Sequence, residues 1–370
     1  MEANSGPRRA KTSRSPLRIW IIVAVVVVVV LGGGVAGAYA TGLLKHKTDD
    51  LGPILTDIPT PVPTEVLTPM PKPKWALTGV IGNLVERPAL VVKVENAEES
   101  RPQAGLEDAD IVFEEMVEGG ISRLAAIYHS TLPEQIVPIR SVRPMDGPIT
   151  AWTGGLLAFS GGQEQFTSRA RNDGLQLISM DLGADGFSRV RGRYAPHDVA
   201  GDPAAFLAQA DGNHQASPPP FCAFDADGTG STAQISGTAT STVSVQISTV
   251  ARPTWTWSDL SHMWMRAEGS TPAMTASGVQ LGADNVLVLD VNVVLLAGTD
   301  AAGTHIPETI VVGQGTGMVA SGAMSAPITW QKDNESSPWQ FFDASGAPLI
   351  LNPGQTWVEL VPTSGSWSVS

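Results

Sequence analysis

The chain has 370 residues, which is enough for about two domains of ordinary size. Its 38 glycines and 28 prolines, beside only nine phenylalanines and three tyrosines, argue against a helical bundle and favour a loop-rich fold of short strands. Residues 1–18 hold five basic residues and one acid, so the remaining chain carries 18 basic and 35 acidic residues, a net charge of −17. Such an acidic body should repel nucleic acid, and we expect no nucleic-acid partner.

Residues 19–40 form an apolar run without a charged side chain. As a helix, this run spans about 33 Å, enough for the hydrocarbon core of a bilayer. The basic residues precede it, which places residues 1–18 in the cytoplasm and the globular part outside. Ala38-Tyr39-Ala40 resembles a signal-peptidase site, so secretion after cleavage is the alternative. No cysteine stands directly after the run, so it is not a lipoprotein signal. Its apolar core is longer than that of a usual signal peptide, so we predict an uncleaved single-pass membrane anchor.

A proline-rich segment, residues 41–75, follows the predicted anchor. Proline at this density favours an extended polyproline II conformation at about 3.1 Å per residue. We predict a semi-rigid spacer that holds the globular part away from the membrane.

Residues 76–212 mix strand and helix patterns and are predicted to form an α/β domain. Ala89–Val94 reads as a buried strand, and Leu156–Phe159 as a strand that leads into a helix near Gln163–Arg171. Ile136–Pro144 is predicted to be extended, because prolines disfavour a helix there. Asp202 is predicted to cap a short helix over Pro203–Gln209.

Residues 213–240 are rich in small and polar residues and are predicted to link this domain to a second one, residues 241–370. The second region contains short alternating apolar patterns separated by turn residues, which indicates a mostly β domain, a small barrel or a sandwich. The predicted fold class is therefore α+β: a mixed α/β domain and a β-rich domain after one transmembrane helix. Seven tryptophans in the second region are predicted to form its core and not a sugar-binding surface.

The centre of the first region is a predicted β-hairpin, in which Asp110–Glu118 and Ile121–His129 flank Gly119-Gly120. Two adjacent glycines readily supply the positive φ angles of a two-residue loop. That loop pairs residues whose numbers sum to 239, so Arg123 would share one face with Glu114 and Glu118 as diagonal neighbours. The opposite, mostly apolar face would pack on the core. The simpler interpretation of the charges is a solvated face with weak surface ion pairs.

Arg140 and Arg143 lie in the predicted extended segment, and His197 lies in a loop between Pro196 and Asp198. Arginine pairs bind carboxylate or phosphate groups in a bidentate way, although each could instead neutralise a nearby acid. On an ideal strand two residues three apart point to opposite faces, so a turn is needed to bring these arginines to one ligand. His197 could carry a proton or serve a structural role. The predicted ligand-binding residues are Glu114, Glu118, Arg123, Arg140, Arg143 and His197.

The sequence indicates neither a metal site nor a cofactor site. The six histidines are widely scattered, and Asp225-Ala226-Asp227-Gly228 lacks the glutamate and the flanking helices of a calcium loop. The glycine-rich run 313–317 is not followed by a helix pattern, as a dinucleotide-binding loop would require. Cys222 cannot form an internal disulfide and is assigned no role.

Several motifs resemble the YerB-like family of bacterial envelope proteins, many of them lipoproteins, whose two domains have no settled function. In the first region the resemblance is carried by Arg101–Leu106, Ala109–Glu114, Val117–Arg123, Arg140–Pro144 and Pro196-His197. In the second it is carried by Asn285-Val286, Ile328–Lys332 and Gly354–Pro362. The lipid-attachment cysteine is missing, and Asp198 stands where the family suggests asparagine. The resemblance implies an envelope location and two domains, and it supplies no reaction.

Two functions of different class follow from these residues. In the first, the protein is a binding, scaffold or regulatory module that recognises an anionic wall-associated ligand, a cell-wall polymer or an envelope protein. In the second, it is a hydrolase of wall glycan that uses Glu114 and Glu118 as its carboxylate pair. Arg123 between two carboxylates would spoil the general acid, so binding is the favoured prediction.

Overall fold

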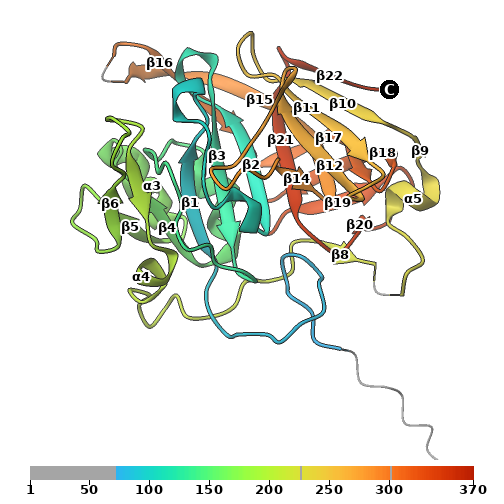
Figure 1. Cartoon of the computed structure of the whole chain (residues 1–370), viewed down its shortest axis with the longest axis horizontal. Coiled ribbons are helices and arrows are strands. Elements are labelled where there is room, and N and C mark those ends of the chain that lie inside the picture. The colour runs from blue at the N-terminus through green and yellow to red at the C-terminus, as the bar shows by residue number, and fades with distance from the viewer. Residues whose placement is uncertain (1–71, 226, 301) are drawn as a thin grey trace, which may run out of the picture. The chain divides into compact units, whose positions relative to one another are not determined.

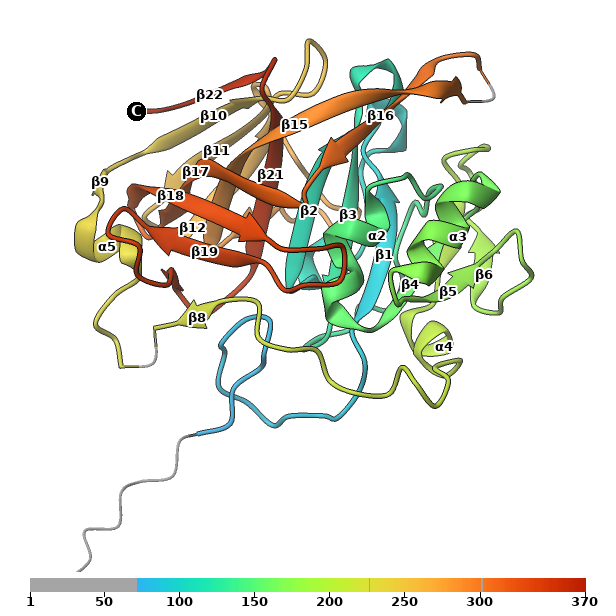
Figure 2. The same cartoon turned by 180° about the vertical axis from the view of Figure 1, so that it is seen from behind.

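A single long β-sheet runs through both predicted domains (Figures 1 and 2). The structure is a computed structural model that describes residues 72–225, 227–300 and 302–370. Along the main path of this sheet, the strands are ordered β19 (Gln340–Asp343), β18 (Met324–Lys332), β17 (Gly313–Ser321), β15 (Asn285–Thr299), β21 (Thr356–Pro362), β2 (Ile111–Met116), β3 (Ser122–Tyr128), β1 (Leu90–Glu95), β4 (Leu156–Phe159) and β5 (Gln176–Ser179). Two further strands complete it, with β16 (His305–Ile310) beside β15 and β9 (Thr238–Ala239) beside β18.

A second sheet of six strands packs against the C-terminal part of the first. Its order is β13 (Thr271–Pro272), β12 (Met263–Glu268), β11 (Pro253–Ser258), β10 (Thr242–Gln246) and β22 (Ser366–Val369), with β14 (Gly282–Ala283) beside β12. Trp255 and Trp264 of this sheet are fully buried and belong to the same apolar cluster as Val112 and Trp357 of the first sheet. Apolar burial of this size is the main force that holds two sheets face to face.

The remaining elements are short. Two small sheets pair β6 (Phe187–Arg189) with β7 (Val199–Gly201) and β8 (Ala223–Phe224) with β20 (Ile350–Leu351). The α-helices are α2 (Asp146–Thr150), α3 (Glu164–Asn172), α4 (Pro203–Leu207) and α5 (Thr232–Ser236). The 3₁₀ turns are η1 (Glu98–Ser100), η2 (Leu106–Asp108), η3 (Glu118–Gly120) and η4 (Ala151–Thr153). Helices α2 and α3 cover the face of the first sheet opposite the second sheet (Figure 2).

Most local predictions for the first region are confirmed. Strand β4 has the predicted bounds, β1 and α3 differ from prediction by one residue at each end, and α4 begins at the predicted proline. The Asp202 carboxylate accepts hydrogen bonds from the backbone N–H groups of Ala204 and Ala205, at 2.9 and 3.1 Å, as expected for a helix cap. The second region is rich in strands, as predicted.

The two regions share one core. Strand β2 of the first region pairs in parallel with β21 of the second, and Phe113 of β2 stacks on Trp339 with ring centroids 5.6 Å apart. The Trp339 Nε1–H also donates to the carbonyl oxygen of Ile149 in α2, at 3.1 Å. The segment predicted as a linker, residues 213–240, contributes β8, α5 and β9 to these layers. The predicted membrane anchor, residues 19–40, lies outside the described residues, and within the described ranges no helix is long and apolar enough to cross a membrane.

The predicted hairpin exists, but its register was wrong by one residue. Val117 donates its N–H to the carbonyl of Ile121 at 2.8 Å, so the loop has three residues and not two. Gly119 and Gly120 both adopt positive φ angles, 70° and 71°, as their lack of a side chain allows. Paired residue numbers therefore sum to 238, and a one-residue shift changes which side chains share a face. Both faces of the hairpin are also buried, so neither is the solvated face that the sequence suggested.

A shared core predicts that both regions unfold together. The Phe113→Ala substitution should lower the free energy of unfolding by about 3–5 kcal/mol, because a fully buried ring between two other aromatic rings is lost. The full chain is unfolded with denaturant and followed by tryptophan fluorescence and by circular dichroism. The midpoint of the transition should shift by the same amount with both probes. Leu260→Ala, at a side chain that is 96 % exposed, is the matched control and should change stability by less than about 0.5 kcal/mol. Two separate transitions would contradict a shared core.

Candidate functional site

Alternation along β1, β3 and β2 divides the charged residues between the two faces of the sheet. Glu95 and Glu115 both pair with Arg123, so these three side chains form a row across three strands on one face. Glu114 and Ser122 point to the other face. The predicted grouping of Arg123 with Glu114 on one face is therefore wrong, because the register is shifted by one residue.

The first face carries a group that we call the arginine cluster: Arg123, Arg140, Arg143, Glu95, Glu118 and His197. Glu95 uses both carboxylate oxygens, one 2.9 Å from Arg140 Nε and the other 2.8 Å from His197 Nδ1. Glu118 in the hairpin loop lies 2.6 Å from Arg143 Nε. Five of the six predicted ligand-binding residues thus meet here, and Glu114 does not. Glu95 was not among the predicted ligand-binding residues. In the sequence it is only an acidic residue that follows the apolar run of a predicted strand.

Arg123 is the buried member of this cluster. Its side chain is 3 % exposed and donates from one terminal nitrogen to the carbonyl of Ser141, at 2.9 Å. Within the described part of the chain its guanidinium forms no salt bridge, and its buried Nε has no hydrogen-bond partner. Burial lowers the pKa of Arg123 to about 9, and the positive charges of Arg143 and Arg140 add to this effect. Within the cluster three guanidinium groups face two carboxylates, so the cluster taken by itself carries an excess of positive charge.

The outer members of the cluster reach solvent. The side chains of Arg140, His197 and Arg143 are 24 %, 16 % and 11 % exposed. Residues 140–143 are irregular backbone between the bridge of Ile139 to β1 and the start of α2. Both arginines lie near Arg123 although they are three apart in sequence, because this segment is not an ideal strand.

The loop between β6 and β7 extends the basic surface beside the cluster and was not singled out from the sequence. Arg189 at the end of β6 is followed by Arg191 and Arg193 in the loop, and this alternation of arginines could have indicated the basic surface. Arg193 fastens the loop by donating to the carbonyls of Ser100, at 2.7 Å, and Pro102. Tyr194 is 70 % exposed and its ring lies edge-on to His197, 5.9 Å between centroids.

A buried triad supports the arginine cluster from below. Lys93 contacts Glu115 and lies 2.7 Å from Asp146, and all three side chains are fully buried. The other oxygen of Asp146 accepts the backbone N–H of Arg143 at 2.6 Å. Burial raises the pKa of Glu115 to about 8, and the charge of Asp146 adds to the rise while Lys93 opposes it.

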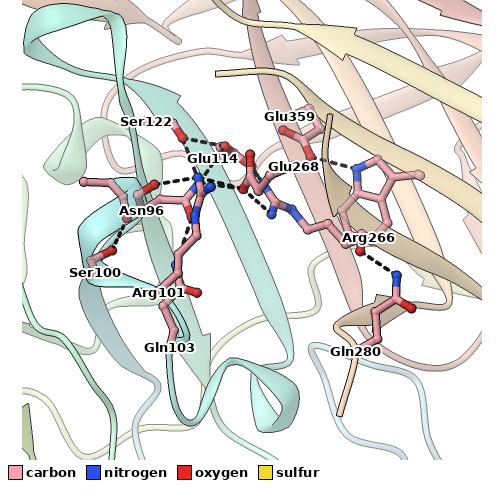
Figure 3. A network of polar contacts seen from close by, with 12 residues as sticks. Asn96, Ser100, Arg101, Gln103, Glu114, Ser122, Arg266, Glu268, Gln280 and Glu359 are labelled. Carbon is pink, nitrogen blue, oxygen red and sulfur yellow. Dashed lines mark hydrogen bonds and ion pairs between the residues drawn. The ribbon is translucent and has the colours of Figure 1, made fainter. Parts of the chain in front are cut away.

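The opposite face carries a second group, the buried ion network of Asn96, Arg101, Glu114, Arg266, Glu268 and Glu359 (Figure 3). Glu114 is fully buried and accepts hydrogen bonds from Ser122 Oγ, at 2.5 Å, and from Arg266, at 2.6 Å. Glu359 pairs with Glu114 in the parallel register and accepts the indole N–H of Trp255 at 2.8 Å. Burial and the neighbouring charge of Glu114 raise the pKa of Glu359 well above its usual value.

The two glutamates proposed for the hydrolase alternative are therefore in different networks. Glu114 is paired with Arg266 inside the protein, and Glu118 is paired with Arg143 at the hairpin loop. A glycosidase needs two carboxyl groups that flank one bond. This arrangement does not provide such a pair. None of the described residues form a cluster of three or more potential metal ligands.

Comparison with known proteins identifies the family. The model of the "Protein of unknown function (DUF3048) N-terminal domain" matches residues 77–216, and that of the DUF3048 C-terminal domain matches residues 243–358. The chain belongs to the DUF3048 family. It is similar to "Putative lipoprotein YerB" of Bacillus subtilis (strain 168), with 45 % identity over 74 residues, which are 20 % of this chain and 22 % of that protein. The resemblance inferred from the sequence motifs is thus confirmed.

The crystal structure of the YerB protein from Bacillus subtilis has the same fold. It matches with a TM-score of 0.68 at 22 % sequence identity, covering 80 % of this chain and 100 % of that chain. The first domain model ends at residue 216, inside the segment predicted as a linker, and the second begins at residue 243, just after that segment. Both regions nevertheless contribute strands to one sheet.

The raised pKa of Glu115 predicts a pH-dependent stability. Between its ordinary pKa of 4.5 and the folded value of about 8, the folded protein holds a proton that the unfolded chain releases. The contribution of Glu115 to stability is therefore largest at the acid end of this window and falls as the pH rises through 8. Glu115→Gln imitates the protonated form, so its stability relative to the parent should rise by up to about 1.4 kcal/mol per pH unit from pH 5.5 to 8.5. Urea denaturation at several pH values measures this difference.

Glu164→Gln, at an exposed position of α3, is the control and should follow the parent curve at every pH. Parallel curves for Glu115→Gln and the parent would show that Glu115 is ionised in the folded protein over the whole range.

Proposed function

We propose that this protein is a membrane-anchored module of the cell envelope that binds an anionic ligand of the cell wall through the arginine cluster. The apolar run at residues 19–40 and the similarity to a protein named as a lipoprotein support the membrane association. The basic residues before that run support an orientation with the globular part outside the cell.

The observation that carries the proposal is the excess of guanidinium groups. Arg123, Arg140 and Arg143 lie together, and Arg123 lacks a carboxylate partner among the described residues. The chain after residue 18 has a net charge of −17, so a local positive site is the place where an anion would bind. Arginine forks bind planar carboxylates and phosphates through paired hydrogen bonds, and partial burial strengthens such contacts.

The surroundings of the cluster fit a ligand larger than a single ion. Arg191 and the ring of Tyr194 are exposed on the adjacent β6–β7 loop. An exposed aromatic ring beside cations offers an apolar face for a sugar or peptide unit that carries the acidic group. The buried triad fixes the backbone of Arg143, so the site is formed before the ligand arrives.

Binding to the cell wall tests this proposal. The full chain in detergent should co-sediment with purified wall sacculi that retain their anionic polymers, and less with sacculi from which those polymers have been extracted. Arg140→Gln and Arg143→Gln together should weaken binding at least about tenfold, because each removes a charged hydrogen-bond donor. Binding of the parent should also fall with added salt, as expected for charged contacts near the surface.

Arg171→Gln is the matched control, because Arg171 is exposed on α3 and lies outside the cluster. Thermal unfolding of each variant separates a loss of binding from a loss of folding. The proposal is overturned if the double variant, still folded, binds as tightly as the parent, or if the parent binds neither preparation of sacculi.

A further inference from the structure

A cavity of about 560 Å³ opens on the face of the sheet that carries the buried ion network, away from the face of the arginine cluster. One wall is segment 98–103, and the other comes from β12, β13 and the residues around Val250 and Arg252. The volume falls within the range of small-ligand sites, about 300–1,000 Å³. Its wall residues come from both matched domains of the family.

One side of the cavity is fixed by the buried ion network (Figure 3). Glu268 Oε1 alone accepts contacts from Arg266 at 2.5 Å, Arg101 at 3.1 Å and Asn96 at 3.2 Å. Burial alone would lower the pKa of Arg266, but the carboxylates of Glu114, Glu268 and Glu359 outweigh it and raise the pKa. The charges in this wall are thus paired with one another.

The free charges of the cavity are Glu98 and Arg252. Both are exposed, both line the cavity, and over the described ranges neither takes part in a salt bridge. The same cavity has an apolar lining, contributed by Pro102, Val250, Pro272, Ala273 and Met274. Val250 is 61 % exposed and Met274 is 40 % exposed, so the apolar part of the lining is accessible to a ligand.

We propose that this cavity binds a short peptide with a free ammonium group and a free carboxylate. The carboxylate binds Arg252, the ammonium group binds Glu98, and the peptide side chains contact the apolar surface. A simple anion such as phosphate is disfavoured, because Glu98 and Glu268 would repel it. A simple cation is disfavoured for the corresponding reason, because Arg101 and Arg252 line the same space. The proposal is independent of the arginine cluster.

Calorimetric titration of the full chain in detergent tests this inference with two probes, trialanine and trileucine. At least one should bind saturably with a dissociation constant in the millimolar range or lower. Acetylating its amino end or amidating its carboxyl end should each weaken binding about tenfold, since each cap removes one charge. A peptide with both caps should bind more weakly still.

Two substitutions test which residue binds each end of the peptide. Arg252→Gln should weaken binding of the uncapped peptide about tenfold and should not weaken the amidated peptide further, because the partner of Arg252 is already absent. Glu98→Gln should weaken binding of the uncapped peptide about tenfold and should not weaken the acetylated peptide further, because the partner of Glu98 is already absent. Both side chains are exposed, so both variants should fold. Arg171→Gln and Glu164→Gln, on exposed positions of α3, are the charge-matched controls and should bind as the parent does.

The inference is overturned if neither peptide binds the parent. It is overturned equally if the capped peptides bind as tightly as the uncapped one, or if Arg252→Gln and Glu98→Gln leave the affinity unchanged.

Discussion

The ion pair between Arg266 and Glu114 joins the two regions and constrains how they can be arranged, because each is a buried charge that needs the other. The parallel pairing of β2 with β21 places Glu114 beside Glu359, so two buried carboxyl groups are neighbours within the first sheet. Arg266 from the second sheet supplies the charge that this pair requires, and its guanidinium also lies 5.0 Å from the ring centre of Trp357. Removing one partner of such a buried pair leaves an uncompensated charge, which is strongly destabilising. The arrangement of the two sheets is therefore tied to the register of β2 and β21.

Strands β1, β2 and β3 support both candidate sites, because alternate side chains on each strand point to opposite faces of the sheet. On β1, Glu95 holds Arg140 and His197 of the arginine cluster, and the next residue, Asn96, donates to Glu114 and Glu268 on the other face. Gln103, which lines the cavity, donates to the carbonyl of Glu95 at 3.1 Å. The end of β1 is thus a common support, and a change in its backbone would affect both faces. Substitutions at the exposed Arg252 and the partly buried Arg143 separate the two sites, whereas substitutions at Glu95 or Asn96 would not.

The sequence contains the local features of this fold but not the contacts between distant segments. The glycine pair indicates the hairpin, and proline with Asp202 marks the start of α4, since these effects depend on neighbouring residues. The glycine pair does not determine the hairpin register, because glycines occur in hairpin loops of two and of three residues. The difference decides whether Glu114 or Glu115 shares a face with Arg123. Arg266 could not be connected with Glu114, which lies 152 positions earlier, because no local pattern records a contact between sheets. The grouping of Arg123, Arg140, Arg143 and His197 was reached from residue chemistry, and the structure places them together.

Stability alone does not account for the buried triad beneath the arginine cluster. Replacing a buried ion pair by well-packed apolar residues often leaves stability unchanged or raises it. The presence of Lys93, Glu115 and Asp146 therefore needs an explanation other than stability. Asp146 accepts the backbone N–H of Arg143, and the carbonyl of Lys93 accepts the backbone N–H of Arg140 at 2.8 Å. Both of these partly buried arginines are therefore anchored to triad residues through their backbones, close to the buried charge of Arg123. Like charges repel one another, and these backbone hydrogen bonds hold the arginines in place against that repulsion. A site formed in this way loses little conformational freedom when an anion binds, so more of the contact energy is available as affinity.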